Sequence, residues 1–253
     1  MRYFGPAITL ILLTACACGS GESPVDASLD DIEATLDELQ VKPRARLVPK
    51  VAEVGGFERL DASPPLPSFA GVSWPPQLGR RYPNLSLLGT QGNVVSLSDY
   101  EGKIILIELV GMQCGACNAF SGGNLVGAFP NSKVQGNLRS ISEYVAQYGK
   151  GMRLDDPNIV FVQLIIFNMR NEAPALADIR AWSKHFRFEG SANHYVLAGT
   201  KDMISNVSFN MIPGFQLIDQ NFILRSDSTG HHPVHDLYRH LIPLLRNLVL
   251  QRS

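Results

Sequence analysis

Two long apolar runs dominate the hydrophobic pattern of this chain, at residues 103–110 and 159–167. Runs that stay apolar instead of alternating are typical of central strands that are covered on both faces. Between the two runs, apolar positions recur at the spacing of a helix. This predicted helix ends at Gly149. Its apolar face is formed by Leu138, Ile141, Tyr144, Val145 and Tyr148.

Further elements are expected on either side of these runs. They are a β-hairpin that pairs 85–88 with 94–97, a helix over 176–186, a strand over 194–197, and a hairpin that pairs 215–218 with 222–224. Pro233 is expected to open a last helix, and Pro243 to kink it. Strands that alternate with helices and end in a hairpin and a helix indicate an α/β sandwich.

The N-terminus has the layout of a secretory signal peptide. Arg2 is followed by a short apolar run that ends in Leu13-Thr14-Ala15-Cys16. These four residues resemble a bacterial lipobox, in which cleavage before the cysteine is followed by lipidation of that cysteine. We therefore expect Cys16 to carry lipid; the alternative is an ordinary cleaved signal. Because Ala17 is not an aspartate, the resemblance favours the outer membrane of a Gram-negative host.

The pattern predicts three parts of the chain. Residues 1–15 form the signal peptide, and residues 16–78 form a lipid-anchored tether with a possible short helix at 28–40 and a proline-rich linker at 61–76. Residues 79–253 form the folded domain. No run of about 20 apolar residues predicts a transmembrane helix in that domain.

Composition and charge narrow the function. The chain has 253 residues, of which 45% are hydrophobic and 18% charged, as in a globular protein. Its 22 basic and 23 acidic side chains nearly cancel, so there is no electrostatic case for binding nucleic acid.

Two of the four cysteines, Cys114 and Cys117, lie in the domain, directly after the first apolar run. A strand, a short turn, Cys-x-x-Cys and a helix place the first thiol at a helix N-terminus, where free N–H groups stabilise thiolate. The second thiol then resolves the mixed disulfide. We expect Cys114 to be the nucleophile and Cys117 the buried resolving thiol.

The surrounding motifs resemble the thioredoxin-like superfamily, and within it the membrane-tethered TlpA/ResA-like thiol-disulfide oxidoreductases and related redoxins. They are the lead over 95–103, the Cys pair, and the segment 212–219 with Pro213. The resemblance implies a three-layer α/β/α sandwich with a central mixed sheet and an N-terminal hairpin extension. It also implies that Pro213 is a cis-proline that lies against the Cys pair and helps to bind an extended substrate.

The resemblance assigns further site residues. Glu108 occupies the place of a buried acid that assists proton transfer to the resolving cysteine, and burial in an apolar strand should raise its pKa. The alternative is a glutamate that backbone or water satisfies. Gln113, where the family commonly has tryptophan, and Ile212 are expected to contact the substrate. The glycines and the proline of segment 121–136 exclude a long regular helix there, so we expect an insertion beside the active site.

Other readings remain open. His231, His232 and His235 could join the cysteines in binding copper or zinc, as in a metallochaperone. A redox-inert interaction module with the same fold is a further alternative. Gly111 stands where a peroxiredoxin needs threonine or serine, which argues against peroxidase chemistry.

The sequence thus predicts thiol-disulfide exchange on exported proteins, with no cofactor and no nucleic acid. The expected partners are exported thiols and disulfides and an upstream redox partner, and the lipid anchor would hold the protein at the membrane, facing the periplasm.

Overall fold

The computed structural model describes residues 74–252. The predicted signal peptide, Cys16, the helix at 28–40 and most of the proline-rich linker lie outside the described residues. The contacts of the domain extend back to Trp74, whose indole Nε1 donates a hydrogen bond to Ser208 Oγ at 2.9 Å.

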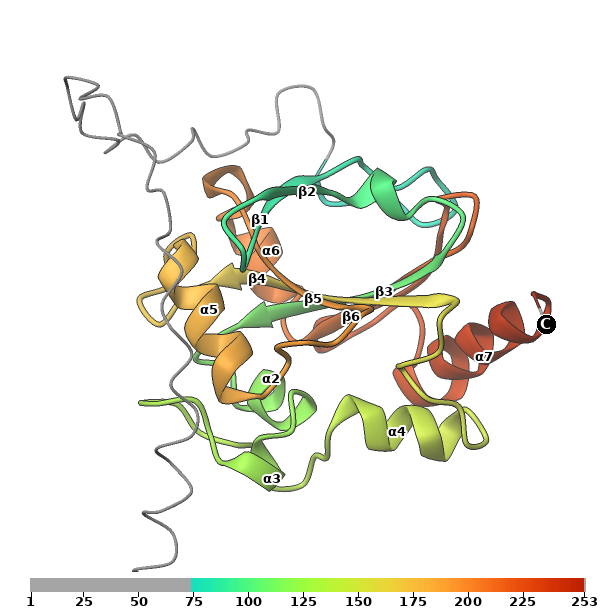
Figure 1. Ribbon diagram of the computed structural model, residues 1–253. Coiled ribbons are helices and arrows are strands. Elements are labelled where there is room, and N and C mark those ends of the chain that lie inside the picture. Colours follow the sequence, from blue (N-terminus) through green and yellow to red (C-terminus); the bar gives the residue numbers. More distant parts are fainter. Residues whose placement is uncertain (1–73, 253) are drawn as a thin grey trace, which may run out of the picture. The chain divides into compact units, whose positions relative to one another are not determined.

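A seven-stranded mixed sheet with the order β2-β1-β5-β4-β3-β6-β7 forms the centre of the domain (Figure 1). The strands β3, β4 and β5 are parallel, and all other neighbours are antiparallel. The strands are β1 (Ser86–Gly89), β2 (Val94–Ser96), β3 (Ile104–Gly111), β4 (Ile159–Phe167), β5 (His194–Ala198), β6 (Gly214–Ile218) and β7 (Leu224–Thr229).

The two apolar runs are the central strands β3 and β4, and every residue in both is buried. This confirms the prediction that both of their faces are covered. Each strand carries one side chain with hydrogen-bonding groups, and the register places these two residues, Glu108 and Gln163, opposite each other.

Four of the helices, α2, α4, α5 and α7, pack on the same face of the sheet (Figure 1). The other face is closed by the hairpin β1–β2, by residues 74–82 and by the segment around α6. The helices are α2 (Gly115–Phe120), α3 (Gly123–Val126), α4 (Ile141–Tyr148), α5 (Leu176–His185), α6 (Asn206–Asn210) and α7 (Ile242–Leu250). Within residues 74–252, no helix combines the length and apolarity needed to cross a bilayer.

The parallel pair β3–β4, the antiparallel pair β6–β7 and the closing helix α7 define a thioredoxin-like α/β fold, which confirms the predicted fold class. The N-terminal hairpin extends the sheet, as expected, through the antiparallel contact of β1 with β5. The layer on the second face is thin, because α6 has only five residues.

Two boundaries near the C-terminus differ from the prediction. Phe222 has a φ of 63°, so it belongs to the turn, and β7 begins only at Leu224. The last helix does not open at Pro233. Asp236 accepts hydrogen bonds from the next N–H groups and caps a π-helical turn, Leu237–Leu241, that leads into α7. Pro243 is the second residue of α7, which follows directly after the π-helical turn.

We predict that Gly214→Ala destabilises the domain at the start of β6. An added Cβ would meet the Met211 carbonyl oxygen and lie 2.7 Å from Thr229 Cγ2. Overpacking of this kind should lower the free energy of unfolding by about 1–3 kcal/mol in urea denaturation. Gly136→Ala is the matched control, because nothing lies within 4 Å of its added Cβ. Equal stability of the two variants would contradict the prediction.

Candidate functional site

The cysteine pair lies where β3 gives way to α2. The Cys114 N–H donates to the Gly111 carbonyl at 3.0 Å, which closes the turn after the strand. Cys114 is the N-cap of α2, and its Sγ accepts a hydrogen bond from the Cys117 N–H at 3.2 Å. Both cysteines are free thiols; Cys114 is half-buried and Cys117 is 0% exposed. Only the first sulfur is therefore open to a partner.

The two thiols have opposite electrostatic environments. Hydrogen bonds from the Cys117 thiol and from the N–H groups of Cys117 and Ala116 lower the pKa of Cys114 to about 7, although burial opposes this shift. Burial, together with the hydrogen bond and charge of Cys114 and the charge of Glu108, raises the pKa of Cys117 well above its ordinary value. Near neutral pH, Cys114 is therefore partly a reactive thiolate, whereas Cys117 is a protonated thiol.

Glu108 lies fully buried in β3, on the face that α2 covers. Burial raises the pKa of Glu108 to about 8, the hydrogen bond from Gln163 lowers it, and the charge of Cys114 raises it further. This direction is the one expected from the sequence. Its Oε1 has no hydrogen-bond partner among the described residues.

The Ile212–Pro213 peptide bond is cis, and both residues line the same cavity of about 400 Å³ as Cys114. An added Cβ on Gly111 would lie 3.6 Å from Ile212 Cγ2 and 3.8 Å from Cys114 Cβ. The cis-proline segment and the cysteine turn therefore both pack against the end of β3. The remaining lining residues include Gln113, Gln135, Phe167, Phe209 and His231. The structure thus places Pro213 beside the thiol, as the resemblance implies.

Gln113 is exposed at the edge of this cavity. Its Nε2 donates a hydrogen bond to the Met169 carbonyl oxygen, in the loop that follows β4. The side chain therefore links two loops and leaves its amide oxygen for another donor.

Segment 121–136 lies beside the cysteines, as expected. Its helices are short, since α2 ends at Phe120 and α3 has four residues. The Gln135 N–H donates to the Gly115 carbonyl at 2.9 Å, which brings the end of the segment against the start of α2.

Asn118, a residue that the sequence reasoning missed, fastens this segment. Its Nδ2 donates to the carbonyls of Met112 and Cys114 at 3.0 and 2.9 Å. Its Oδ1 accepts from the Phe129 N–H and the Ser132 hydroxyl at 2.8 and 2.9 Å. The signal available in the sequence was an asparagine directly after the second cysteine; its complete burial, which requires hydrogen-bond partners, is seen only in the structure.

The three candidate histidines do not lie together at the cysteines. His231 lines the Cys114 cavity, whereas His235 hydrogen-bonds Ser226 at 3.1 Å and stacks on His240 with ring centroids 3.9 Å apart. His232 is exposed. Within the described part of the chain, no three His, Cys, Asp or Glu side chains come together as metal ligands. The structure therefore offers no observation in favour of the metallochaperone reading.

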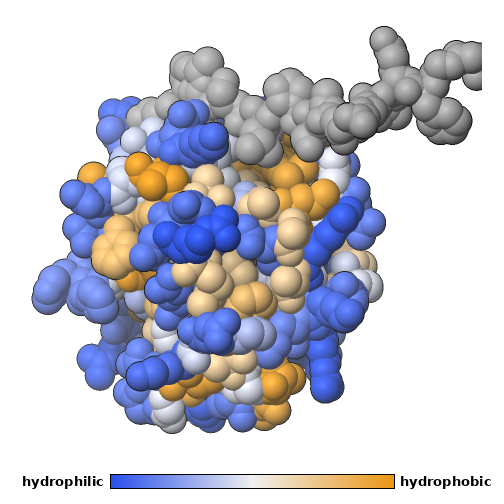
Figure 2. Space-filling view, turned by 90° about the vertical axis from the view of Figure 1, so that its left-hand side faces the viewer, coloured by the Kyte–Doolittle hydropathy of each residue, from blue (hydrophilic) through white to orange (hydrophobic). Residues whose placement is uncertain are grey.

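Apolar side chains are exposed around the cis-proline loop. Phe209, which lines the cavity, is 59% exposed, and Val207 on the same short helix is 53% exposed. Figure 2 views the side to which β3 and β4 point in Figure 1, and apolar residues appear there between hydrophilic ones. An apolar segment of another protein would find contacts there.

Comparisons with known proteins give no family by sequence: no family model and no curated protein matches the chain. Among solved structures, it is similar to the thioredoxin domain of a thiol-disulfide oxidoreductase from Bacteroides vulgatus, with 19% identity, a TM-score of 0.38, and coverage of 65% of this chain and 95% of that one. A thiol:disulfide interchange protein from Bacteroides sp. has 16% identity and a TM-score of 0.41, with 69% and 91% covered.

A SCO1/SenC family lipoprotein from Bacillus anthracis is also similar, with 16% identity, a TM-score of 0.40, and 66% of this chain and 93% of that one covered. At these low identities and scores, the fold assignment rests on the strand order and connections of the chain itself.

We predict that Glu108→Gln makes the free energy of unfolding fall less steeply as the pH rises. The pKa of Glu108 in the folded protein, about 8, lies above the ordinary glutamate value of 4.5. Between these two pH values the folded state therefore holds a proton that the unfolded chain has lost. Its contribution to stability is therefore lost as pH rises, by up to about 1.4 kcal/mol per pH unit.

Urea unfolding at pH 5, 6 and 7 checks this prediction. The free energy of unfolding of Glu108→Gln minus that of the unchanged protein should increase with pH. Using the difference cancels the contributions of other groups, such as half-buried His194, whose pKa is lowered to about 3 by removal from water. A difference that stays constant from pH 5 to 7 would show that Glu108 is ionised in the folded state.

Proposed function

We propose that this protein exchanges disulfides with other proteins through Cys114 and Cys117. The observation that carries the proposal is the asymmetry of the pair: Cys114 is partly exposed and has a lowered pKa, whereas Cys117 is buried and has a raised pKa. A redox-inert binding module would have no need for this asymmetry. The cavity shared by Cys114 and the cis-proline Pro213 supports the proposal, because it gives a partner access to the reactive sulfur.

The exchange proceeds in two steps. The Cys114 thiolate attacks one sulfur of the partner's disulfide, a Cys114–partner disulfide forms, and the partner's other sulfur leaves as a thiolate. Cys117 then loses its proton to Glu108 and attacks Cys114 Sγ. The Cys114–Cys117 disulfide forms, and the second partner thiolate is released and takes a proton from water. The partner gains two electrons, and the reverse sequence oxidises a partner dithiol.

Substrate contact is assigned to the residues that line the cavity. The backbone of Ile212 and Pro213 borders the cavity next to Cys114, so an extended segment that enters it would run past both. The Gln113 amide oxygen would accept a hydrogen bond at the rim.

We further propose that the partners are exported proteins and that a lipid on Cys16 holds the protein at the membrane, the outer one in a Gram-negative host. The support comes from the sequence alone, namely the short apolar run and Leu13-Thr14-Ala15-Cys16. Each methylene of a buried lipid chain adds roughly 0.8 kcal/mol of membrane affinity. An upstream redox partner would return the pair to its working redox state.

We predict that the purified protein accelerates the reduction of insulin disulfides by dithiothreitol, and that Cys114→Ser abolishes this acceleration. Because thiolate is the nucleophile, the Cys114-dependent rate should rise with pH around a midpoint near 7. Ser142→Ala, a change of an exposed serine on α4, is the control and should keep full activity. The absence of any Cys114-dependent rate would refute the function.

In cells, we predict that Cys117→Ser accumulates mixed disulfides through Cys114, because the resolving thiol is missing. The captured proteins, identified by mass spectrometry, should carry export signals, and the complexes should fractionate with membranes. Cys16→Ala should release the protein from the membrane fraction. Capture of cytoplasmic proteins only, or membrane association unchanged by Cys16→Ala, would overturn the proposed location.

A further inference from the structure

Gln163 is the hydrogen-bonding neighbour of Glu108, and nothing in the mechanism above uses it. It lies fully buried in β4, opposite Glu108 in the register of the two parallel strands. Its Nε2 donates to Glu108 Oε2 at 2.8 Å and to Ser121 Oγ at 2.7 Å. Its Oε1 accepts from Trp182 Nε1 at 3.2 Å. Both N–H groups and the carbonyl of the amide are therefore engaged.

Trp182 determines which way this amide faces. An indole N–H is only a donor, so the amide must present its oxygen to Trp182 and its NH₂ group to the other side. Glu108 can then meet only a donor at Oε2. An amide that turned over would place two acceptors, Gln163 Oε1 and Glu108 Oε2, against each other and would leave the buried indole without a partner.

Glu108 Oε1 has no hydrogen-bond partner in the described part of the chain, and the Sγ of Cys117 lies 4.0 Å from the carbonyl oxygen of the next residue in β3, Leu109. Among the described residues, the titratable groups that act on Glu108 are the thiols of Cys114 and Cys117 on α2. The other elements packed around it present no titratable side chain: β6 places Phe215 beside Glu108, and β4 and α5 present Gln163 and Trp182.

We propose that Gln163 is a positioning residue for thiol-disulfide exchange, which holds Glu108 by Oε2 so that its proton is carried on Oε1 and passes between Oε1 and Cys117 Sγ. This inference rests on the proposed function. The hydrogen bond serves both states of the acid, because Oε2 accepts from the amide whether Oε1 is protonated or not. Glu108 therefore need not reorient when it gains or loses the proton.

The proton and electron balance follows the second step of the exchange. The Cys117 S–H bond breaks and an O–H bond forms on Oε1 as Cys117 Sγ attacks Cys114 Sγ. The Cys114–Cys117 bond forms while the bond from Cys114 to the partner breaks. The partner sulfur leaves with the electron pair, so the partner is reduced and the cysteine pair is oxidised. In the reverse step, Glu108 returns the proton to Cys117.

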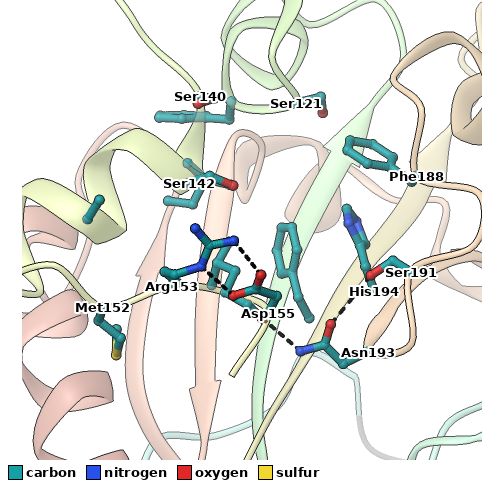
Figure 3. Close-up of a pocket in the computed structure, with 15 residues that line it drawn as sticks. Ser121, Ser140, Ser142, Met152, Arg153, Asp155, Phe188, Ser191, Asn193 and His194 are labelled. Carbon is teal, nitrogen blue, oxygen red and sulfur yellow. Dashed lines mark hydrogen bonds and ion pairs between the residues drawn. The ribbon is translucent and has the colours of Figure 1, made fainter. Parts of the chain in front are cut away.

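The second N–H group of Gln163 bonds Ser121, the C-cap of α2. Ser121 lines a cavity of about 350 Å³ (Figure 3). Gln163 is thus anchored on two sides, by Trp182 and by Ser121, independently of Glu108. These anchors hold the amide in place while the charge of Glu108 changes.

The test uses a small disulfide that reports both steps. The reduced full-length protein, in which Cys16→Ser and Cys18→Ser leave Cys114 and Cys117 as the remaining thiols, is mixed with 5,5′-dithiobis(2-nitrobenzoate) in a stopped-flow instrument. The first thionitrobenzoate released reports attack by Cys114, and the second reports attack by Cys117 on the mixed disulfide. Gln163→Met replaces the amide with an apolar side chain of similar length. Since the amide hydrogen bond lowers the pKa of Glu108, its loss should move the pH profile of the second phase upward.

We expect Gln163→Met to leave the first phase within about twofold of the unchanged protein and to slow the second phase at pH 7. A shift of one pH unit in the profile corresponds to about a tenfold loss of rate. In a Glu108→Gln background, Gln163→Met should have no further effect on the second phase, because the residue acts only through Glu108. Ser142→Ala is the control for both phases.

Trp182→Phe provides a second variant, which keeps an aromatic ring at this position but removes the indole N–H that orients the Gln163 amide. It should also slow the second phase and shift its pH profile upward. An unchanged second-phase profile in both variants, or an equal loss in the Glu108→Gln background, would overturn the role of Gln163. Absence of the first phase in the unchanged protein would instead refute the proposed function, so the two failures are distinguishable.

Discussion

The burial of β3 on both of its faces is the constraint on which the site depends. Because β3 lies in the middle of the sheet, between β4 and β6, and layers pack on both of its faces, every side chain in it is removed from water. Its single carboxylate, Glu108, is therefore held in a medium that favours the protonated form. The same strand ends at Gly111, next to the side chains of both Cys114 and Ile212.

The two sulfurs differ in their pKa because Cys114 lies near the surface and Cys117, one helical turn later, lies in the core. Cys114 caps α2 and receives the N–H of Cys117, while Cys117 points back toward β3, with its Sγ 4.0 Å from the Leu109 carbonyl. Hydrogen bonds stabilise charge on the first sulfur, and burial opposes charge on the second. In the proposed exchange, the proton of the buried sulfur therefore passes to the buried acid Glu108.

The surroundings of the thiols are built by segments far apart in the chain. Asn118 fastens segment 121–136 beside α2, and the cis-proline Pro213 arrives from the loop before β6. On the opposite side, Trp182 from α5 orients Gln163 of β4 against Glu108. Segment 121–136, the loop before β6, α5 and β4 thus all contribute to the surroundings of the cysteine pair and of Glu108.

The sequence by itself determined the strands and the cysteine turn, because burial on both faces leaves an unbroken apolar run and a Cys-x-x-Cys pair is local. It also predicted a raised pKa for Glu108, since burial in an apolar strand disfavours the charged form of a single carboxylate. Only the tertiary structure decided that Gln163 stands opposite Glu108 and that Trp182 orients it, because strand register and helix packing are not written in local spacing. The start of the last helix was missed at Pro233 for the same reason: the His235 N–H pairs with Asp227 of β7, and Asp236 supplies the cap.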